Sequence, residues 1–227
     1  MSEPVTPSVG RGVLHLFCKP TPLFDGEAVV AAVRRAEEAG VQVVAVSTLG
    51  HKCDAAFMAM HDDLHQLRAL QSGLQRGGLE VVDSYVSLTE VSEYAKGMPQ
   101  EHLNARLYPD IPPKSGDMNA WCFYPMSKKR DASANWFTRP YEERSELMRE
   151  HGTSGRKFAG RVVQYVTGST GLDDYEWGVT LFGVRPDDLK EVVYTMRFDR
   201  ASSVFGEFGQ FYTGMVVPVE ELVTTLA

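Results

Sequence analysis

Three side chains in the segment Tyr124-Pro125-Met126-Ser127-Lys128 could act together on a ligand. Alternate residues of a β-strand point to the same face, so the spacing predicts that Tyr124, Met126 and Lys128 share one face. A phenol, a thioether and an ammonium make a poor core stripe but a reasonable lining for a pocket that holds an anionic, oxidisable ligand. An edge strand with an amphipathic tyrosine and a snorkelling lysine would show the same spacing, and the pattern leaves both interpretations open.

His151 is a second candidate, because an imidazole nitrogen can serve as the proximal ligand of iron. It follows Leu147 and Met148 on an amphipathic helix and precedes Gly152, which we predict to end that helix. A histidine in this position would feel the negative end of the helix dipole, which favours a basic, electron-donating imidazole. Taken alone, the position favours a structural histidine over an iron ligand.

The other five histidines give weaker indications of a site. His15, His51 and His102 are isolated near strand ends or in loops, where a solvated or hydrogen-bonded imidazole is expected. His61 and His65 are four residues apart at the start of a predicted helix and could share a face. Two histidines at this spacing can bind zinc, but neither Glu nor Cys completes the ligand set, so a solvated helix face is favoured.

Three further polar residues occupy positions that could face a ligand. Gln164 lies within an otherwise apolar predicted strand, Arg106 precedes Leu107, and Arg197 ends a predicted helix. Either arginine could hold a carboxylate with its planar fork of donors, although a solvated surface arginine is the commoner case. The sequence contains no GxGxxG, P-loop, GxSxG or HExxH motif.

The elements that must position these residues follow one order twice. Apolar and β-branched runs in the first half predict strands at 13–17, 41–48, 55–60 and 79–88, with helices at 25–39 and after Asp62. The second half has predicted strands at 121–126, 162–167, 177–184 and 207–217, with helices at 141–151 and 187–198. Each half is thus a ferredoxin-like β-α-β-β-α-β unit, and we predict an α+β fold in which two such repeats enclose a core, with helices outside.

Local signals support the duplication. Asp62 is predicted to cap the second helix of the first half and Gly77-Gly78 to end it, and Asp62-Asp63-Leu64 is echoed by Asp187-Asp188-Leu189 in the second half. Residues 94–113, rich in proline and polar side chains, are predicted to form a linker between the halves.

Composition limits the class of function. The 227 residues carry a formal net charge of −7, which argues against a nucleic-acid partner because such binding needs clustered lysine and arginine. The three cysteines, Cys18, Cys53 and Cys122, are too widely spaced for a disulfide framework or a CxxC metal site. Without a basic and apolar leader, and without an apolar run of about 20 residues, we expect a cytoplasmic protein with no membrane span.

Most of the second half resembles a known family. The matching segments are Trp121 to Arg130 with Asn135-Trp136, Leu147 to Gly152, Gly155 to Phe158, Gly171 to Val179, Met196 to Asp199, and Phe205 to Gly209. They resemble the coproheme decarboxylases of the Firmicutes type, in the chlorite-dismutase-like superfamily. The resemblance covers nearly all of residues 104–217 and is weaker in the first half, chiefly at 46–57 and 84–94. It implies a dimeric α+β barrel within one chain, with a degenerate half at 1–103 that lacks the haem site and a haem-binding half at 104–227.

The resemblance also implies roles for the residues singled out above. His151 matches the proximal iron ligand, and Tyr124 matches the tyrosine that becomes a radical. Lys128 matches the lysine beside the propionate that reacts second, and Met126 matches a residue packed on the porphyrin edge. Tyr124 and Lys128 are therefore the expected catalytic pair, and His151 is the expected metal ligand.

Four more residues match contacts of the porphyrin in this family. Arg106 and Arg197 match propionate anchors, and Ser202 matches a further hydrogen bond to a propionate. Gln164 matches the distal-side glutamine of the decarboxylases, whereas chlorite dismutases carry an arginine there, so Gln164 speaks against chlorite chemistry. The loop at 112–119 is longer than in the family, which leaves the setting of Arg106 open, and the segment 19–25 replaces a longer insertion.

The implied reaction is the peroxide-dependent oxidative decarboxylation of iron coproporphyrin III (coproheme) to haem b through a three-propionate intermediate. This is the last step of coproporphyrin-dependent haem biosynthesis, and coproheme is both the substrate and the redox cofactor. The alternatives are a haem peroxidase or chlorite-dismutase-like enzyme, or a non-catalytic haem carrier. The family further implies a homo-oligomer, usually a pentamer, and a transient contact with the ferrochelatase that supplies coproheme.

Overall fold

The apolar segments of the first half form the elements that their spacing predicts. The computed structural model describes residues 3–95, 97–115 and 117–227. Lys96 of the predicted linker, Gly116 of the predicted long loop, and the first two residues of the chain lie outside the described residues. The elements of the first half are β1 (Gly12–Pro20), α1 (Gly26–Glu38), β2 (Gln42–Leu49), β3 (Ala55–His61), α2 (Leu64–Arg76) and β4 (Leu79–Thr89).

The second half repeats this order with small additions. Its main elements are β5 (Ala120–Lys128), α4 (Tyr141–Arg156), β8 (Val162–Gly168), β9 (Trp177–Gly183), α5 (Pro186–Met196), β10 (Gly206–Phe208) and β11 (Tyr212–Val216). The additions are α3 (Gln100–Leu107), the hairpin strands β6 (Arg130–Asp131) and β7 (Ala134–Asn135), a 3₁₀ turn (Trp136–Thr138), α6 (Arg200–Ser203) and α7 (Val219–Leu226). Among the described residues, no helix is long and apolar enough to cross a membrane.

The two halves close into one antiparallel barrel. The hydrogen-bonded order is β2-β3-β1-β4 in the first half and β11-β5-β9-β8 in the second, which is the same order for corresponding strands. Strand β11 pairs with β2, and β4 pairs with β8, so each half supplies an edge strand to the other and both free edges disappear. The predicted α+β fold of two ferredoxin-like repeats is confirmed.

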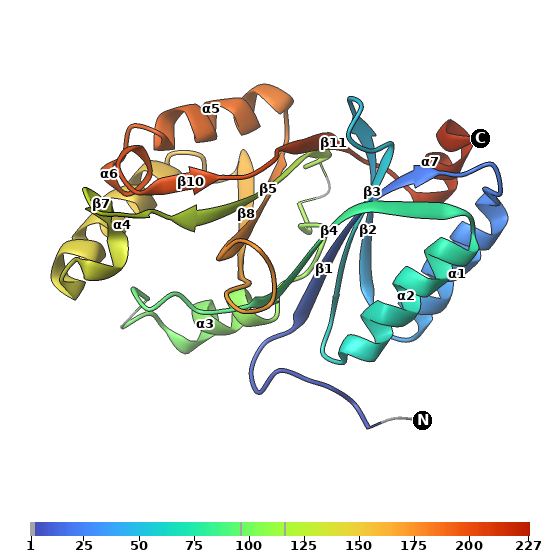
Figure 1. Cartoon of the computed structure of the whole chain (residues 1–227), viewed down its shortest axis with the longest axis horizontal. Helices are drawn as coiled ribbons and strands as arrows, with labels where there is room; N and C mark the ends of the chain where they lie inside the picture. Colours follow the sequence, from blue (N-terminus) through green and yellow to red (C-terminus); the bar gives the residue numbers. More distant parts are fainter. Residues whose placement is uncertain (1–2, 96, 116) are drawn as a thin grey trace.

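Three apolar layers hold this arrangement. Alternate residues of the strands fill the barrel with large side chains, among them Phe17, Met58, Trp121, Phe123 and Phe182. Helices α1, α2 and α7 cover the outer face of the first half, whereas α4, α5 and α6 gather outside the second half (Figure 1). The first of these outer layers is the larger, because α1 and α2 pack directly on the strands below them.

The two seams where the halves join differ in length. The β11–β2 seam contains four residue pairs, whereas the β4–β8 seam contains two, Leu88 with Gly168 and Thr89 with Thr167. Buried side chains reinforce the shorter seam from inside the barrel. Their hydrogen bonds join the halves at Ser87 and Thr167 (2.8 Å), at Tyr85 and Ser169, and at His15 Nε2 and Thr180 Oγ1 (2.9 Å).

His15 differs from its sequence-based expectation, since it lies in the middle of β1 and is 1% exposed. Burial lowers the pKa of its imidazole to about 3, so the side chain is neutral. Its imidazole is therefore not solvated, and it joins the two halves through the hydrogen bond with Thr180.

Several predicted boundaries were wrong for local reasons. The predicted linker contains α3, whose residues are all at least partly exposed, so no apolar stripe announced it. Asp63 rather than Asp62 caps α2, because its carboxylate accepts from the His65 amide, while Asp62 pairs with Arg11. The strand predicted at 207–217 is interrupted between β10 and β11, where the Gly209 amide donates to the Pro125 carbonyl.

The shorter seam yields a stability prediction. Tyr85→Phe removes the hydroxyl that bonds Ser169 but keeps the ring that packs on Phe123, so the free energy of unfolding should fall by about 1 kcal/mol. Tyr194→Phe, at a side chain that is 51% exposed, is the matched control and should change it by less than about 0.5 kcal/mol. Urea unfolding monitored by tryptophan fluorescence measures both, and equal values for the two variants would contradict the role given to the seam.

Candidate functional site

Tyr124, Met126 and Lys128 lie on the outer face of β5, as their spacing predicts. Trp121 and Phe123 alternate with them and point into the barrel. The Tyr124 ring stacks on Phe211 at 4.4 Å between centroids and meets Phe208 edge-on at 5.9 Å. Burial raises the pKa of the Tyr124 phenol, so the group keeps its proton at neutral pH.

The outer face continues from β5 across β9 to β8. Strand register places Val179 and then Val166 beside Tyr124, and Val166 remains 44% exposed although it is apolar and within the sheet. Gln164, one row further along β8, is within the strand as predicted, and its side chain is exposed. Together these residues form a largely apolar floor with Gln164 beside it.

Lys128 is buried at the end of this floor. Its Nζ donates to the Ala201 carbonyl at 2.5 Å and lies 4.7 Å from the centre of the Trp136 ring. Burial lowers the pKa of the ammonium to about 8, although the nearby Glu176 carboxylate opposes that shift. Glu176 is itself buried and accepts from the Lys128 amide at 2.8 Å, which fixes the end of β5. The site therefore contains a desolvated cation at the edge of an apolar surface.

His151 lies inside α4, because the helix continues through Gly152 to Arg156. The prediction that Gly152 ends the helix was wrong, and with it the argument from the helix dipole, which acts within the last turn. A carboxylate supplies the electron-donating influence instead. His151 Nδ1 lies 3.1 Å from Asp199 Oδ2, and Asp199 Oδ1 accepts from Ser154 Oγ at 2.8 Å.

The carboxylate determines which nitrogen of His151 is available. Burial and the positive charge of Lys128 lower the pKa of His151, while Asp199 opposes them. In the neutral ring a carboxylate partner holds the proton on Nδ1, and the lone pair is then on Nε2. Among the described residues Nε2 has no hydrogen-bond partner. This is the arrangement by which proteins orient a histidine as a metal ligand.

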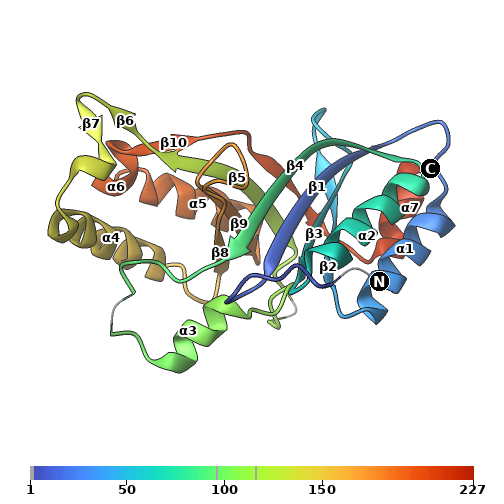
Figure 2. The same ribbon diagram turned by 60° about the horizontal axis from the view of Figure 1, so that its bottom comes forward.

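Helix α4 packs mainly against α5 and α6 rather than on a strand. It buries only Leu147 and Ser154, so it lacks the apolar stripe with which α1 and α2 lie on the sheet. Figures 1 and 2 show the three helices grouped at the end of the molecule remote from α1 and α2. Helix α4, which carries His151, is thus held by other helices and lies outside the sheet that carries Tyr124. We call this helix the wall of the site.

The remaining predicted residues lie around this arrangement without contacting its centre. Arg197 follows α5 and is exposed, with its guanidinium 4.1 Å from the ring centre of Tyr194 and 5.0 Å from that of Phe198. Ser202 is half-buried in α6, next to the Ala201 carbonyl that accepts from Lys128. Arg106 is exposed in the last turn of α3, and no described hydrogen bond or ion pair joins it to the floor.

Sequence reasoning missed three residues that hold this site. Asp199 orients His151 through a hydrogen bond. Trp136 contacts the ammonium of Lys128 with its ring, and Glu176 accepts from the Lys128 amide. All three belong to segments that resemble the family, but neither their type nor their spacing indicated a partner 8 to 48 residues away. The contacts of Asp199 and Glu176 depend on how α6 and the loop before β9 pack, and the spacing of apolar residues does not predict that packing.

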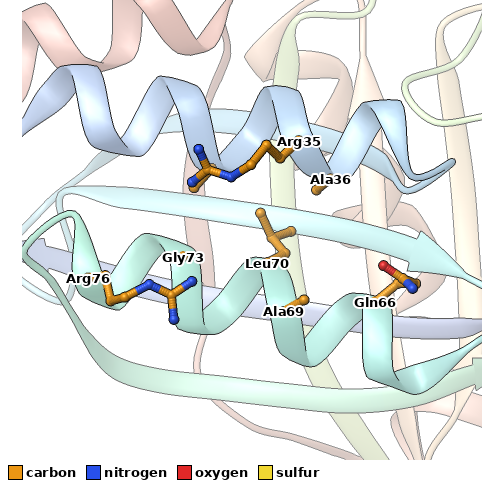
Figure 3. A pocket seen from close by; sticks show the side chains of 8 residues that line it. Arg35, Ala36, Gln66, Ala69, Leu70, Gly73 and Arg76 are labelled. Atoms are coloured by element: carbon orange, nitrogen blue, oxygen red, sulfur yellow. The ribbon is translucent and has the colours of Figure 1, made fainter. Parts of the chain in front are cut away.

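Two other places can be set aside. A hollow of about 170 Å³ between α1 and α2 is lined by alanine and glycine residues and by Arg35, Gln66, Leu70 and Arg76 (Figure 3). It lies on the first half of the chain, whereas Tyr124 is on β5 of the second. His61 ends β3 whereas His65 is in α2, so the two histidines do not share a helix face. Within the described parts of the chain, no group of three His, Cys, Asp or Glu side chains could hold a metal ion by itself.

Comparison with known proteins shows which proteins this chain is similar to. A coproheme decarboxylase from Staphylococcus carnosus (strain TM300) is 41% identical over 187 residues, which are 77% of this chain and 73% of that protein. The solved structure of a haem-binding protein from Thermus thermophilus matches with a TM-score of 0.84 and 34% identity, covering 100% of this chain and 99% of that one.

A more distant structure matches in fold. A variant chlorite dismutase from Candidatus Nitrospira defluvii has a TM-score of 0.76 at 19% identity, covering 97% of this chain and 96% of that one. The chlorite dismutase family matches residues 25–217, which is most of the sequence. The chain therefore belongs to the chlorite dismutase family.

Proposed function

We propose that this chain binds coproheme in its second half, residues 104–227, and decarboxylates two of its propionates with hydrogen peroxide to give haem b. The observation that carries the proposal is the pairing of two surfaces: the floor with Tyr124, Met126 and Lys128, and the wall with His151 held by Asp199. The coproheme decarboxylase from Staphylococcus carnosus, 41% identical, supports this choice of substrate.

The residues present fit an iron porphyrin. His151 Nε2 would hold the iron, and the Asp199 carboxylate would strengthen the imidazole as a donor. The apolar floor around Val166 and Phe208, each more than 40% exposed, suits a flat macrocycle. Lys128, Arg106, Arg197 and Ser202 would meet the negative propionates, with Met126 at the macrocycle edge and Gln164 on the side opposite His151.

The reaction requires an oxidant and a hydrogen-atom acceptor. One propionate, one hydrogen peroxide and one proton give a vinyl group, carbon dioxide and two water molecules. When bound, the iron porphyrin would supply the redox chemistry through which peroxide acts as the two-electron oxidant. We propose that Tyr124, kept as a neutral phenol by burial, gives up an electron and a proton and then takes a hydrogen atom from the β-carbon of the propionate. Loss of carbon dioxide and of a second electron to the peroxide-derived oxidant would then leave the vinyl group. Lys128 would position the propionate that reacts second, after leaving the Ala201 carbonyl.

Related proposals follow from the family. Gln164 at the distal position would favour decarboxylation over chlorite chemistry.

A haem carrier is the second candidate function, because the Thermus thermophilus relative at 34% identity is described as haem-binding. We also propose a cytoplasmic homo-oligomer that meets ferrochelatase transiently; the family resemblance implies a pentamer.

The first experiment adds ferric coproheme to the purified protein without oxygen and then adds peroxide stepwise, with mass detection of the porphyrin. Two successive losses of carbon dioxide, each with one equivalent of peroxide, are expected. Binding without any loss of mass would overturn the decarboxylase proposal and favour a carrier.

The Tyr124→Phe variant tests the radical role. Phenylalanine keeps the stacking on Phe211 but cannot give up a hydrogen atom, so coproheme binding should be retained and decarboxylation should fall by at least about 100-fold. Tyr194→Phe, on the surface of α5, is the control and should keep full turnover. Unchanged turnover in Tyr124→Phe would remove the radical role from this residue.

The buried charge of Lys128 predicts a stability cost. The pKa is lowered from 10.5 to about 8, so a charged Lys128 costs the fold about 3 kcal/mol at neutral pH. Lys128→Met loses the bond to Ala201 but removes this cost, and the variant should be about 1–2 kcal/mol more stable at pH 7.

The pH dependence follows from the same shift. Between pH 8 and 10.5 the unfolded chain binds more protons than the folded one, so the stability of the unmodified protein rises with pH. The advantage of Lys128→Met should therefore shrink across this range. Lys129→Met, at the neighbouring half-exposed side chain, is the control for urea unfolding at pH 7 and 10. A variant advantage that does not change with pH would contradict the assigned charge.

A further inference from the structure

The floor of the site extends in one row across four neighbouring strands and β10. Register pairs Phe208 with Met126, Met126 with Trp177, Trp177 with Gly168, and Gly168 with Leu88. Directly paired residues of a sheet point to the same side, so this row lies on the outer face with the floor. Met126, a residue of the proposed porphyrin site, is thus only two strands from Gly168.

The Glu90 carboxylate lies on this row. It folds back over Gly168 so closely that a Cβ on that glycine would overlap Glu90 Oε2. Its Oε1 accepts from Trp177 Nε1 at 3.0 Å. A side chain larger than hydrogen at position 168 would displace the carboxylate, so the sheet leaves room for Glu90 beside Trp177.

This carboxylate is exposed and has no ion-pair partner among the described residues; partial desolvation against the sheet raises its pKa, which the hydrogen bond from Trp177 opposes. A groove of about 350 Å³ opens next to it, lined mainly by apolar residues that include Leu88, Val91, Leu107 and Leu172. Its lining residues come from the ends of β4 and β8, from α3 and from the segments beside them. The ribbon shows α3 next to the ends of these strands (Figures 1 and 2). The charges around the row are therefore uneven: Glu90 and an apolar groove lie at its β4 end, whereas the Lys128 ammonium lies in the next row, two residues along β5 from Met126.

We propose that Glu90 is a specificity-determining residue, and that the groove beside it receives an edge of the porphyrin that carries methyl or vinyl groups rather than propionates. This inference rests on the proposed function. A propionate placed over Gly168 would face the exposed Glu90 carboxylate, which has no ion-pair partner among the described residues, and like-charge repulsion disfavours that contact. The same position is favourable for an apolar substituent, which would contact Leu88 and Leu172.

Two consequences follow for a substrate whose four propionates are not equivalent. The unequal ends of the row should hold coproheme in one orientation, so that a defined propionate reaches Tyr124 first. The groove should also accept a newly formed vinyl group better than the propionate from which it came. Glu90 would thus act by exclusion, a role that an anchor residue such as an arginine cannot fill.

The test uses Glu90→Gln, which keeps the size of the side chain and an acceptor for Trp177 but removes the charge. Soret titration gives the dissociation constants of ferric coproheme and haem b for each variant. The ratio of the haem b constant to the coproheme constant should rise about threefold or more, because coproheme with four propionates gains more new orientations near position 90 than haem b with two. Chromatography of the product after one equivalent of peroxide should show a mixture of three-propionate isomers where the unmodified protein gives one.

Two controls separate charge from shape and from surface effects. Glu90→Asp keeps the charge and should retain the selectivity of the unmodified protein to within about twofold. Glu101→Gln removes an exposed carboxylate from α3 and should change neither the ratio nor the isomers. An unchanged ratio together with a single isomer in Glu90→Gln would overturn the inference.

The binding measurement distinguishes this inference from the proposed function. It needs no turnover, so a protein that binds both porphyrins but loses no carbon dioxide would refute decarboxylation while still giving the affinity ratio. Conversely, normal decarboxylation with identical behaviour of Glu90→Gln would leave the function in place and remove Glu90 from it.

Discussion

The hydrogen bond between His151 and Asp199 is the interaction on which the rest of the site depends. It joins α4, a helix that does not lie directly on the sheet, to the short segment that follows α5. That segment also reaches the floor, because the Ala201 carbonyl accepts from Lys128 Nζ and the Phe205 carbonyl accepts from the Lys129 amide. Residues 199–205 therefore set the separation of wall and floor, and a site between two layers needs such a spacer.

The duplicated fold divides two tasks between its halves. In the first half α1 and α2 seal the outer face with apolar side chains, and this half contributes a conventional core. In the second half the corresponding face retains exposed Val166 and Phe208, together with a buried ammonium at Lys128. These features cost stability in the isolated chain, and the sealed half together with the filled barrel offsets that cost.

Apolar runs and their spacing predicted the order of strands and helices along the chain. The two-residue period also predicted the shared face of Tyr124, Met126 and Lys128, because that period depends on local backbone geometry alone. Helix α3 was missed since it buries none of its residues, and the end of α4 was misplaced because Gly152 occupies an ordinary helical position there. The partnership of His151 with Asp199 spans 48 positions and depends on how α6 packs, which no local pattern encodes. The roles of Arg106 and Gln164 rested on resemblance; both side chains are exposed, and only Gln164 is on a strand of the floor.

The unequal seams of the barrel have a dynamic consequence. A sheet opens most readily where few backbone hydrogen bonds must break together, and the β4–β8 seam has half as many residue pairs as β11–β2. Glu90 and Gly168 lie at its end, next to the groove. Local opening of these two residue pairs would expose their amide groups to hydrogen exchange. The first half would stay folded, because the buried Ser87–Thr167 and Tyr85–Ser169 bonds would still hold the two halves together inside the barrel. The β4–β8 seam is thus where the barrel is expected to open locally, and it lies beside the proposed position of the porphyrin edge.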